Sequence, residues 1–244
     1  QTKKWKKKFD KLGRASNRLR DLDVFLSKKE EYRSLLSDRC ERERLYSYLK
    51  SKRDMEFFTF IDLLKSDFYT RLKENWKTFL LDQKDNAISQ KAETSTLISA
   101  LDILHHRMSR VLKKGGRIKS DSHDGDLHAL RIECKKLRYS IEFFSSLFSK
   151  NDIRHLITHL KILQDHLGLY NDICIEQEEL KKFMRTQEQK SSEEDIIHIS
   201  ASVFGLIAHL EEQKKTGRAS FDQVFKEFAQ PVNLKLFKRL IRTR

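Results

Sequence analysis

Cationic side chains recur at helical spacing in the stretch from Leu127 to Phe148, LHALRIECKKLRYSIEFFSSLF. Successive members are three or four residues apart, so a single α-helix places them in one row along one side. The row consists of His128, Arg131, Lys135 and Arg138. At about 1.5 Å per residue it extends over about 15 Å. A row of this length, with guanidinium forks and ammonium point charges, favours an extended anion with many charges over one small anion.

An apolar stripe lies beside this cationic row on the same helix and must be buried. Its members are Leu127, Leu130, Cys134, Leu137, Ile141, Phe144 and Phe148. Lysine and arginine at the border of such a stripe commonly lie along the surface with their charged ends in water, so one helix alone favours that plain role. Repetition of the layout on other helices favours a binding surface instead.

The same layout recurs in two other places. Near the N-terminus a short apolar face accompanies a row of Lys4, Lys7, Lys11 and Arg14. After Thr94 a strongly periodic apolar helix accompanies a row of Arg107, Arg110, Lys114 and Arg117. Three such rows in a chain of 244 residues with a net charge of +14 indicate a polyanionic partner: nucleic acid, an anionic membrane or a condensed phosphate.

Nucleic acid and membrane fit this pattern less well than a condensed phosphate. Aromatic residues such as Phe143 and Phe144 fall within apolar seams rather than among the cations, which disfavours base stacking, although non-specific contact with a nucleic-acid backbone stays open. No stretch reaches the roughly eighteen apolar residues of a membrane span, and the N-terminus lacks the apolar core of a signal peptide. We therefore expect a soluble, cytoplasmic protein without a membrane partner.

Catalytic motifs are absent from the sequence. It contains no GxxxxGK loop, no HExxH and no GxSxG. His155, His159 and His166 share one helical face, but no cysteine or carboxylate completes a metal site at useful spacing. We predict no catalytic residue, no metal site and no cofactor. One enzymatic alternative stays open, in which His128 accepts a phosphoryl group as in helical phosphotransfer bundles.

Periodicity and stop signals predict an all-α fold. Pro231 is the single proline, and Gly115 and Gly116 are expected to stop a helix through left-handed backbone angles. We expect Asp126 to be the N-cap of the central helix. We expect Gly168 to end the helix that begins near residue 151. The expected helices span about 3–18, 20–36, 38–82 with one break, 94–115, 127–148, 151–167, 171–184, 193–215 and 218–229, followed by a short basic helix; the expected linkers are 82–93 and 185–192.

A weak internal repeat connects the two halves of the chain. The segment LRDLDVF from Leu19 matches YNDICIE from Tyr170 at an offset of 151 residues, and Asn17 falls where Gly168 lies. We expect one domain of two homologous helical repeats, about 1–118 and 126–244, joined by a linker at about 115–126.

Several segments resemble the CHAD domain, the conserved histidine α-helical domain. They are LRDLDVF at 19–25, the run from 104 to 118 ending in RVLKKGGRI, LHALRIECKKLRYSIEFF at 127–144, LKILQDHLGLYNDI at 160–173 and ASVFGLIAHL at 201–210. The resemblance implies two pseudo-symmetric antiparallel four-helix bundles whose basic surface binds inorganic polyphosphate without catalysis. It also implies that the domain targets the protein, or a fused partner, to polyphosphate, with polyphosphate granules as a location and sulfate or phosphate as substitutes in a crystal.

The resemblance also assigns residues by position. His128, Arg131, Lys135, Lys136 and Arg138 match the family's basic helix, Lys161 matches a lysine of the next helix, and Arg20, Arg107, Arg110, Lys114 and Arg117 are similar in placement. The family pattern has an equivalent His-Arg helix before the first RDLD element, whereas no histidine precedes His105 here. Either that helix lies upstream of Gln1 or this chain has abandoned it, so the first repeat is expected to lack its first helix.

Overall fold

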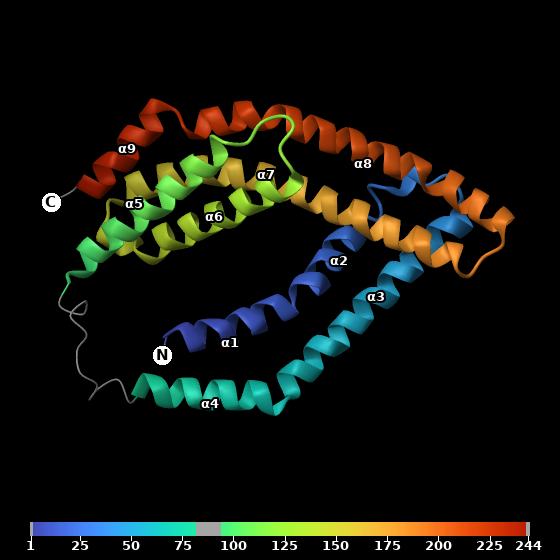
Figure 1. Ribbon diagram of the computed structural model, residues 1–244, viewed down its shortest axis with the longest axis horizontal. Helices are drawn as coiled ribbons and strands as arrows, with labels where there is room; N and C mark the ends of the chain where they lie inside the picture. Colours follow the sequence, from blue (N-terminus) through green and yellow to red (C-terminus); the bar gives the residue numbers. More distant parts are fainter. Residues whose placement is uncertain (1, 82–93, 243–244) are drawn as a thin grey trace. The chain divides into compact units, whose positions relative to one another are not determined.

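Helices make up the regular structure of residues 2–81 and 94–242, which are the residues that this computed structural model describes. No strand occurs among them, so the predicted all-α class is confirmed for the described part of the chain. The elements, labelled in Figure 1, are α1 (Thr2–Ala15), α2 (Asn17–Ser27), η1 (Arg33–Leu35), α3 (Arg39–Lys65), α4 (Asp67–Leu81), α5 (Thr96–Gly115), α6 (Asp124–Phe143), η4 (Ser145–Leu147), α7 (Lys150–Glu188), α8 (Glu193–Phe228) and α9 (Pro231–Arg242).

The helices divide into two compact units, and the two longest helices contribute to both. The first unit contains α1 to α4 together with Ile175–Leu210, which covers the end of α7 and the first half of α8. The second unit contains α5, α6 and α9 with the rest of α7 and α8. This division is spatial, so the expectation of two homologous four-helix-bundle repeats stays a prediction.

Aromatic side chains hold α1 against α4 in the first unit. The ring centroids of Trp5 and Trp76 are 5.0 Å apart, and those of Phe9 and Trp76 are 5.1 Å apart in an edge-on arrangement. Such edge-to-face contacts add about 0.5–1.5 kcal/mol to the burial of the rings. Trp5, which the sequence places on a short apolar face of α1, therefore lies against α4.

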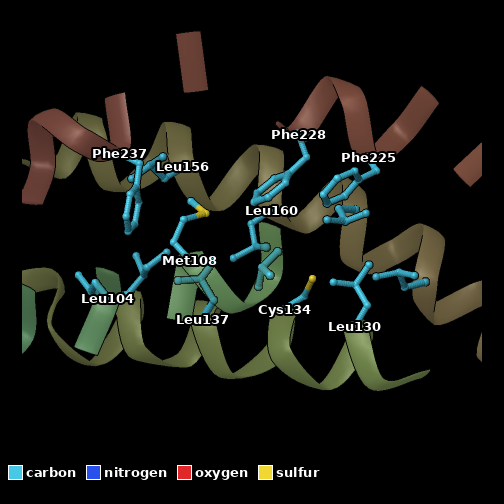
Figure 2. Packing of buried hydrophobic residues seen from close by; sticks show 14 of the residues in the cluster. Leu104, Met108, Leu130, Cys134, Leu137, Leu156, Leu160, Phe225, Phe228 and Phe237 are labelled. Atoms are coloured by element: carbon cyan, nitrogen blue, oxygen red, sulfur yellow. The ribbon is translucent and has the colours of Figure 1, made fainter. Parts of the chain in front are cut away.

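The second unit has a continuous apolar core to which five helices contribute. α6 supplies Leu130, Cys134 and Leu137, which are fully buried. Figure 2 shows these side chains facing Leu104 and Met108 of α5, Leu156 and Leu160 of α7, Phe225 and Phe228 of α8, and Phe237 of α9. Each fully buried leucine stabilises the fold by about 1.5–3 kcal/mol relative to exposure. The predicted apolar stripe of α6 is thus the side that faces the core.

The helix ends predicted at Gly168 and after residue 215 are wrong, because both helices continue through them. α7 runs unbroken through Gly168, and α8 runs unbroken through Gly217. A glycine inside a helix costs about 1 kcal/mol relative to alanine, and burial on both sides of it outweighs that cost. Leu167 and Tyr170 on either side of Gly168 are buried. The predicted linker from 185 shortens accordingly, because α7 continues to Glu188.

Other boundaries differ from the predictions by a few residues. α6 begins at Asp124 rather than after an Asp126 cap, and it ends at Phe143, so Phe148 lies outside the helix. α5 ends at Gly115 as predicted, but Gly116 has a φ of −69°, so the left-handed mechanism is wrong. The first predicted helix is interrupted between α1 and α2, and the expected break within 38–82 falls at Ser66. The predicted linker 82–93 lies outside the described residues.

Candidate anion-binding surface

α6 carries polar residues on both sides of its buried stripe, and the two sides have different surroundings. The row of His128, Arg131, Lys135 and Arg138 is on one side. Glu133 and Lys136 are on the other, because at about 100° per residue they lie across the apolar stripe from that row. The row faces α7 and the opposite side faces α5, as the contacts described below establish. Lys136, which the family resemblance assigns together with the four residues of the row, therefore lies on the other side of α6.

A hydrogen bond joins the first member of the α6 row to α7. Nδ1 of His128 donates to Oδ1 of Asn171 at 2.6 Å. Near the other end of α6, Ile141 and Leu156 line the same small cavity. Contacts thus move backward along α7 as they move forward along α6, which makes the two helices antiparallel.

This antiparallel register brings Lys161 level with Arg138. Residues 161, 164, 168 and 171 recur at steps of three and four, so Lys161 is on the same side of α7 as Asn171. Lys161 is exposed and has no hydrogen bond or ion pair with the described residues. The seam between α6 and α7 is therefore bordered by the four-membered α6 row on one side and by Lys161 on the other. We call these five residues the α6–α7 row.

Polar atoms without protein partners lie along the α6–α7 row. Nε of Arg131 is buried without a hydrogen-bond partner in the described structure, and so is Nε2 of the buried Gln164 on α7. Nε of Arg138 lies 3.6 Å from Oε1 of Glu142, too far for a hydrogen bond. Buried donors usually have an acceptor, and leaving one without costs about 1–3 kcal/mol. An anion lying in this seam would supply acceptors.

A buried carboxylate occupies the other side of α6. Glu133 is 3% exposed, and its Oε1 lies 3.0 Å from Nη2 of Arg110 and 3.1 Å from Nζ of Lys136. Nη1 of Arg107 lies 3.7 Å from Oε2. Burial alone would raise the pKa of Glu133, but the three cations outweigh it and lower the pKa below its ordinary value. Three of the predicted anion-binding residues are thus already paired with an anion of the protein itself.

Sequence reasoning missed Glu133, although the sequence contained a signal for it. The residue is next to Cys134 within the arc of α6 that faces inward, and a carboxylate at such a position is almost never buried without cationic partners. Lys114 and Arg117 continue the α5 row toward the end of the helix and beyond it. Neither side chain has a hydrogen bond or ion pair with the residues that the structure describes.

The remaining predicted cations belong to the first unit. Lys4, Lys7, Lys11 and Arg14 are exposed on α1, and Arg20 is exposed on α2. Nζ of Lys11 lies 4.5 Å from the ring centre of Phe68, and Nε of Arg14 donates to the backbone carbonyl of Asp10 at 3.2 Å.

Cations that the sequence did not single out also occur in the first unit. Lys28 pairs with the buried Glu176 at 2.8 Å, and the hydroxyl of Tyr32 donates to the same carboxylate at 2.7 Å. A separate pocket of about 300 Å³ is lined by Lys29, Glu30, Arg33, Arg39, Arg42 and Glu43. Like Glu133, Glu176 is a buried carboxylate that pairs with a cation of the protein itself.

Residues 2–81 and 94–242 contain neither a candidate membrane span nor a cluster of three or more metal-binding side chains. None of the helices there combines the length and the apolar character needed to cross a bilayer. No group of three or more histidine, cysteine, aspartate or glutamate side chains there is placed to hold a metal ion.

Comparison with known proteins gives a family match and a match to a solved structure. The family model described as the CHAD domain matches residues 1–181. The crystal structure of the CHAD domain from the plant Ricinus communis superimposes with a TM-score of 0.72 at 21% sequence identity, covering 92% of this chain and 71% of the plant chain. At this identity the likeness concerns the fold alone. No curated protein matches the chain.

Proposed function

Because the chain belongs to the CHAD domain family, we propose that it binds inorganic polyphosphate without catalysing a reaction on it. The observation that carries the proposal is the α6–α7 row, which combines cations over about 15 Å of helix with buried donors that lack acceptors. A polymer with about one negative charge per phosphate offers many acceptors along one line. We further propose that this binding targets the protein, or a partner fused to it, to polyphosphate.

The row provides the two kinds of contact that a phosphate polymer needs. Arg131 and Arg138 have planar guanidinium groups that grip two oxygens at once, whereas Lys135 and Lys161 act as mobile point charges. His128 keeps Nε2 for a second contact while Nδ1 bonds to Asn171. Each contact is modest, and binding gains from the release of counterions held by the polymer. We expect affinity to fall as salt rises.

The other predicted rows are proposed as secondary contacts, each within its own unit. Lys114 near the end of α5 and Arg117 just beyond it have no ion-pair partner among the described residues, whereas Arg107 and Arg110 pair with Glu133. On α1, Lys4 and Lys7 are exposed and offer positive charge. We therefore expect substitutions in the α6–α7 row to weaken polyphosphate binding more than substitutions of Arg107 or Arg110.

The decisive experiment compares two double variants that remove the same charge from the second unit. Arg131→Gln with Lys135→Gln changes the α6–α7 row. Lys235→Gln with Lys238→Gln changes exposed residues of α9. In calorimetric titrations with long-chain polyphosphate, the first variant should lose at least about tenfold in affinity, and its salt slope should fall by about 1.4 for two lost contacts.

The control variant should keep most of the affinity, and both variants should keep the helical circular dichroism of the parent. Equal losses in the two variants would mean that net charge alone attracts the polymer, and the proposed row would be wrong. Unfolding of the first variant alone would assign the row a structural role instead.

Two further experiments separate this function from the alternative functions. Displacement of polyphosphate by RNA or duplex DNA at equal phosphate concentration would favour non-specific nucleic-acid binding. Acid-labile phosphate on His128 after incubation with a phosphodonor would favour phosphotransfer. Neither result is expected, because the proposed contacts depend on a dense line of phosphates and require no covalent step.

A further inference from the structure

Two histidines on α7 direct the same ring nitrogen toward each other. His155 and His159 are one helical turn apart, and their Nε2 atoms are 3.2 Å from each other. Their ring centroids are 4.6 Å apart and the ring planes meet at 60°. His155 is exposed and His159 is half-buried. The facing nitrogens are therefore both held by a continuous helix and open to small solutes on at least one side.

The separation of these nitrogens matches that of two imidazole ligands on one metal ion. Zinc–nitrogen bonds in proteins are about 2.0–2.1 Å long, so nitrogens 3.2 Å apart subtend an angle of about 100° at the metal. That value lies between square-planar and tetrahedral geometry. One metal ion can therefore bind both rings with little movement of α7. This preorganisation of the two ligands is the physical origin of chelate affinity.

The surroundings show why the pair stands without a third protein ligand. Asp152 is one turn before His155, but its carboxylate pairs with Arg239 of α9. His166, which shares the same helical face in the sequence, donates from Nε2 to the backbone carbonyl of Gly217 at 2.9 Å. A metal held by His155 and His159 would therefore complete its coordination with water.

We propose that His155 and His159 form a chelating site for a single divalent transition-metal ion. The spacing in the sequence alone predicts no metal site because a third ligand is missing; the distance between the two rings is what favours a two-ligand chelate. Neutral imidazole ligands select Cu²⁺, Ni²⁺ and Zn²⁺, with Cu²⁺ bound most tightly, over Mg²⁺ and Ca²⁺, which prefer oxygen. The site does not rest on polyphosphate binding, since its histidines are turned away from the α6–α7 row around α7.

The test is a calorimetric titration of polyphosphate-free protein with Cu²⁺ and Zn²⁺ in a non-coordinating buffer. The variants are His155→Gln, His159→Gln and the pair together. Loss of either ring breaks the chelate, so each single variant should lose at least about tenfold in affinity and nearly as much as the double variant. Mg²⁺ should give no signal at this site.

A second histidine pair on α5 supplies the matched control. His105 and His106 are both exposed and adjacent in sequence, so they point about 100° apart around the helix and do not chelate. His105→Gln with His106→Gln should leave the tightest metal site unchanged. Metal should also raise the melting temperature of the parent and of this control, but not of the His155/His159 double variant.

Two outcomes would overturn the proposal. The first is that single substitution of His155 or His159 leaves the affinity for Cu²⁺ and Zn²⁺ unchanged, in which case the close approach is a hydrogen bond between imidazoles. The second is that the His105/His106 variant loses as much affinity as the His155/His159 variant. The Arg131/Lys135 variant should keep metal binding, so failure of the polyphosphate proposal and failure of this one are separately visible.

Discussion

Glu133→Gln should destabilise the second unit by about 1–2 kcal/mol at neutral pH. The substitution keeps the shape of the side chain and removes the charge that Arg107, Arg110 and Lys136 share at 3.0–3.7 Å. The side chains of these cations are 31–45% exposed, so water and salt screen each pair to about 0.2–1 kcal/mol. Because three cations share one carboxylate, their contributions are not fully additive.

The pH dependence identifies the cause of that loss. The ion pairs lower the pKa of Glu133 in the folded protein, so their contribution is complete above the ordinary value of 4.5 and disappears as pH falls through the lowered pKa. The parent should therefore melt roughly 3–6 °C above Glu133→Gln near neutral pH. This difference should narrow below pH 4.5, where Glu133 of the unfolded chain becomes protonated, and disappear below the lowered pKa of the folded protein.

Thermal unfolding followed by circular dichroism between pH 7 and pH 3 measures both effects. Glu142→Gln is the matched control, because Glu142 is on the same helix but 46% exposed, with Arg138 3.6 Å away. It should change stability by less than about 0.5 kcal/mol. A Glu133→Gln variant as stable as the parent at pH 7, or one whose loss of stability is equally large at pH 3, would contradict a stabilising role for these ion pairs.

Three further substitutions test the fold through chemical denaturation. Gly168→Ala should stabilise the protein by about 0.5–1 kcal/mol, since a Cβ there meets nothing within 4 Å and alanine favours a continuous α7; a destabilised variant would contradict the unbroken helix. Gly205→Ala should instead cost about 1–3 kcal/mol, because the new Cβ would lie 2.5 Å from the backbone carbonyl oxygen of Leu35. Asp124→Asn should cost about 1 kcal/mol, because two cations of α8 lie 2.6 Å and 3.0 Å from a carboxylate that is 43% exposed; an unchanged midpoint would show that these pairs contribute nothing.

Helical periodicity predicted most of the elements, and the errors concern where helices end. The apolar residues of α5 and α6 recur at three and four over many turns, so the buried side of each helix followed directly from the sequence. Glycine was a poorer guide. Gly217 is not a stop but a close-approach position, where a Cβ would lie 3.2 Å from the ring of Tyr170. Sequence alone does not distinguish a glycine that ends a helix from one that admits a neighbour.

The candidate site was predicted as sets of residues on single helices, and the structure adds which helix each set faces. The spacing of His128, Arg131, Lys135 and Arg138 was sufficient to place them in one row. Nothing in a helical repeat indicates which side adjoins α5 and which adjoins α7, because that depends on tertiary packing. The pairing of Arg107, Arg110 and Lys136 with Glu133 was therefore not foreseen.

The length of the α6 row makes the proposed polyphosphate binding depend on the length of the polymer. A pyrophosphate can reach only one or two of cations that are spread over about 15 Å, whereas a longer polymer reaches all of them at once. The affinity per polyphosphate molecule should therefore rise with each added phosphate until the polymer is as long as the row. Beyond that length, affinity should rise only because the polymer can bind in a greater number of registers. The breakpoint in a series of defined oligomers would report how much of α6 is in use.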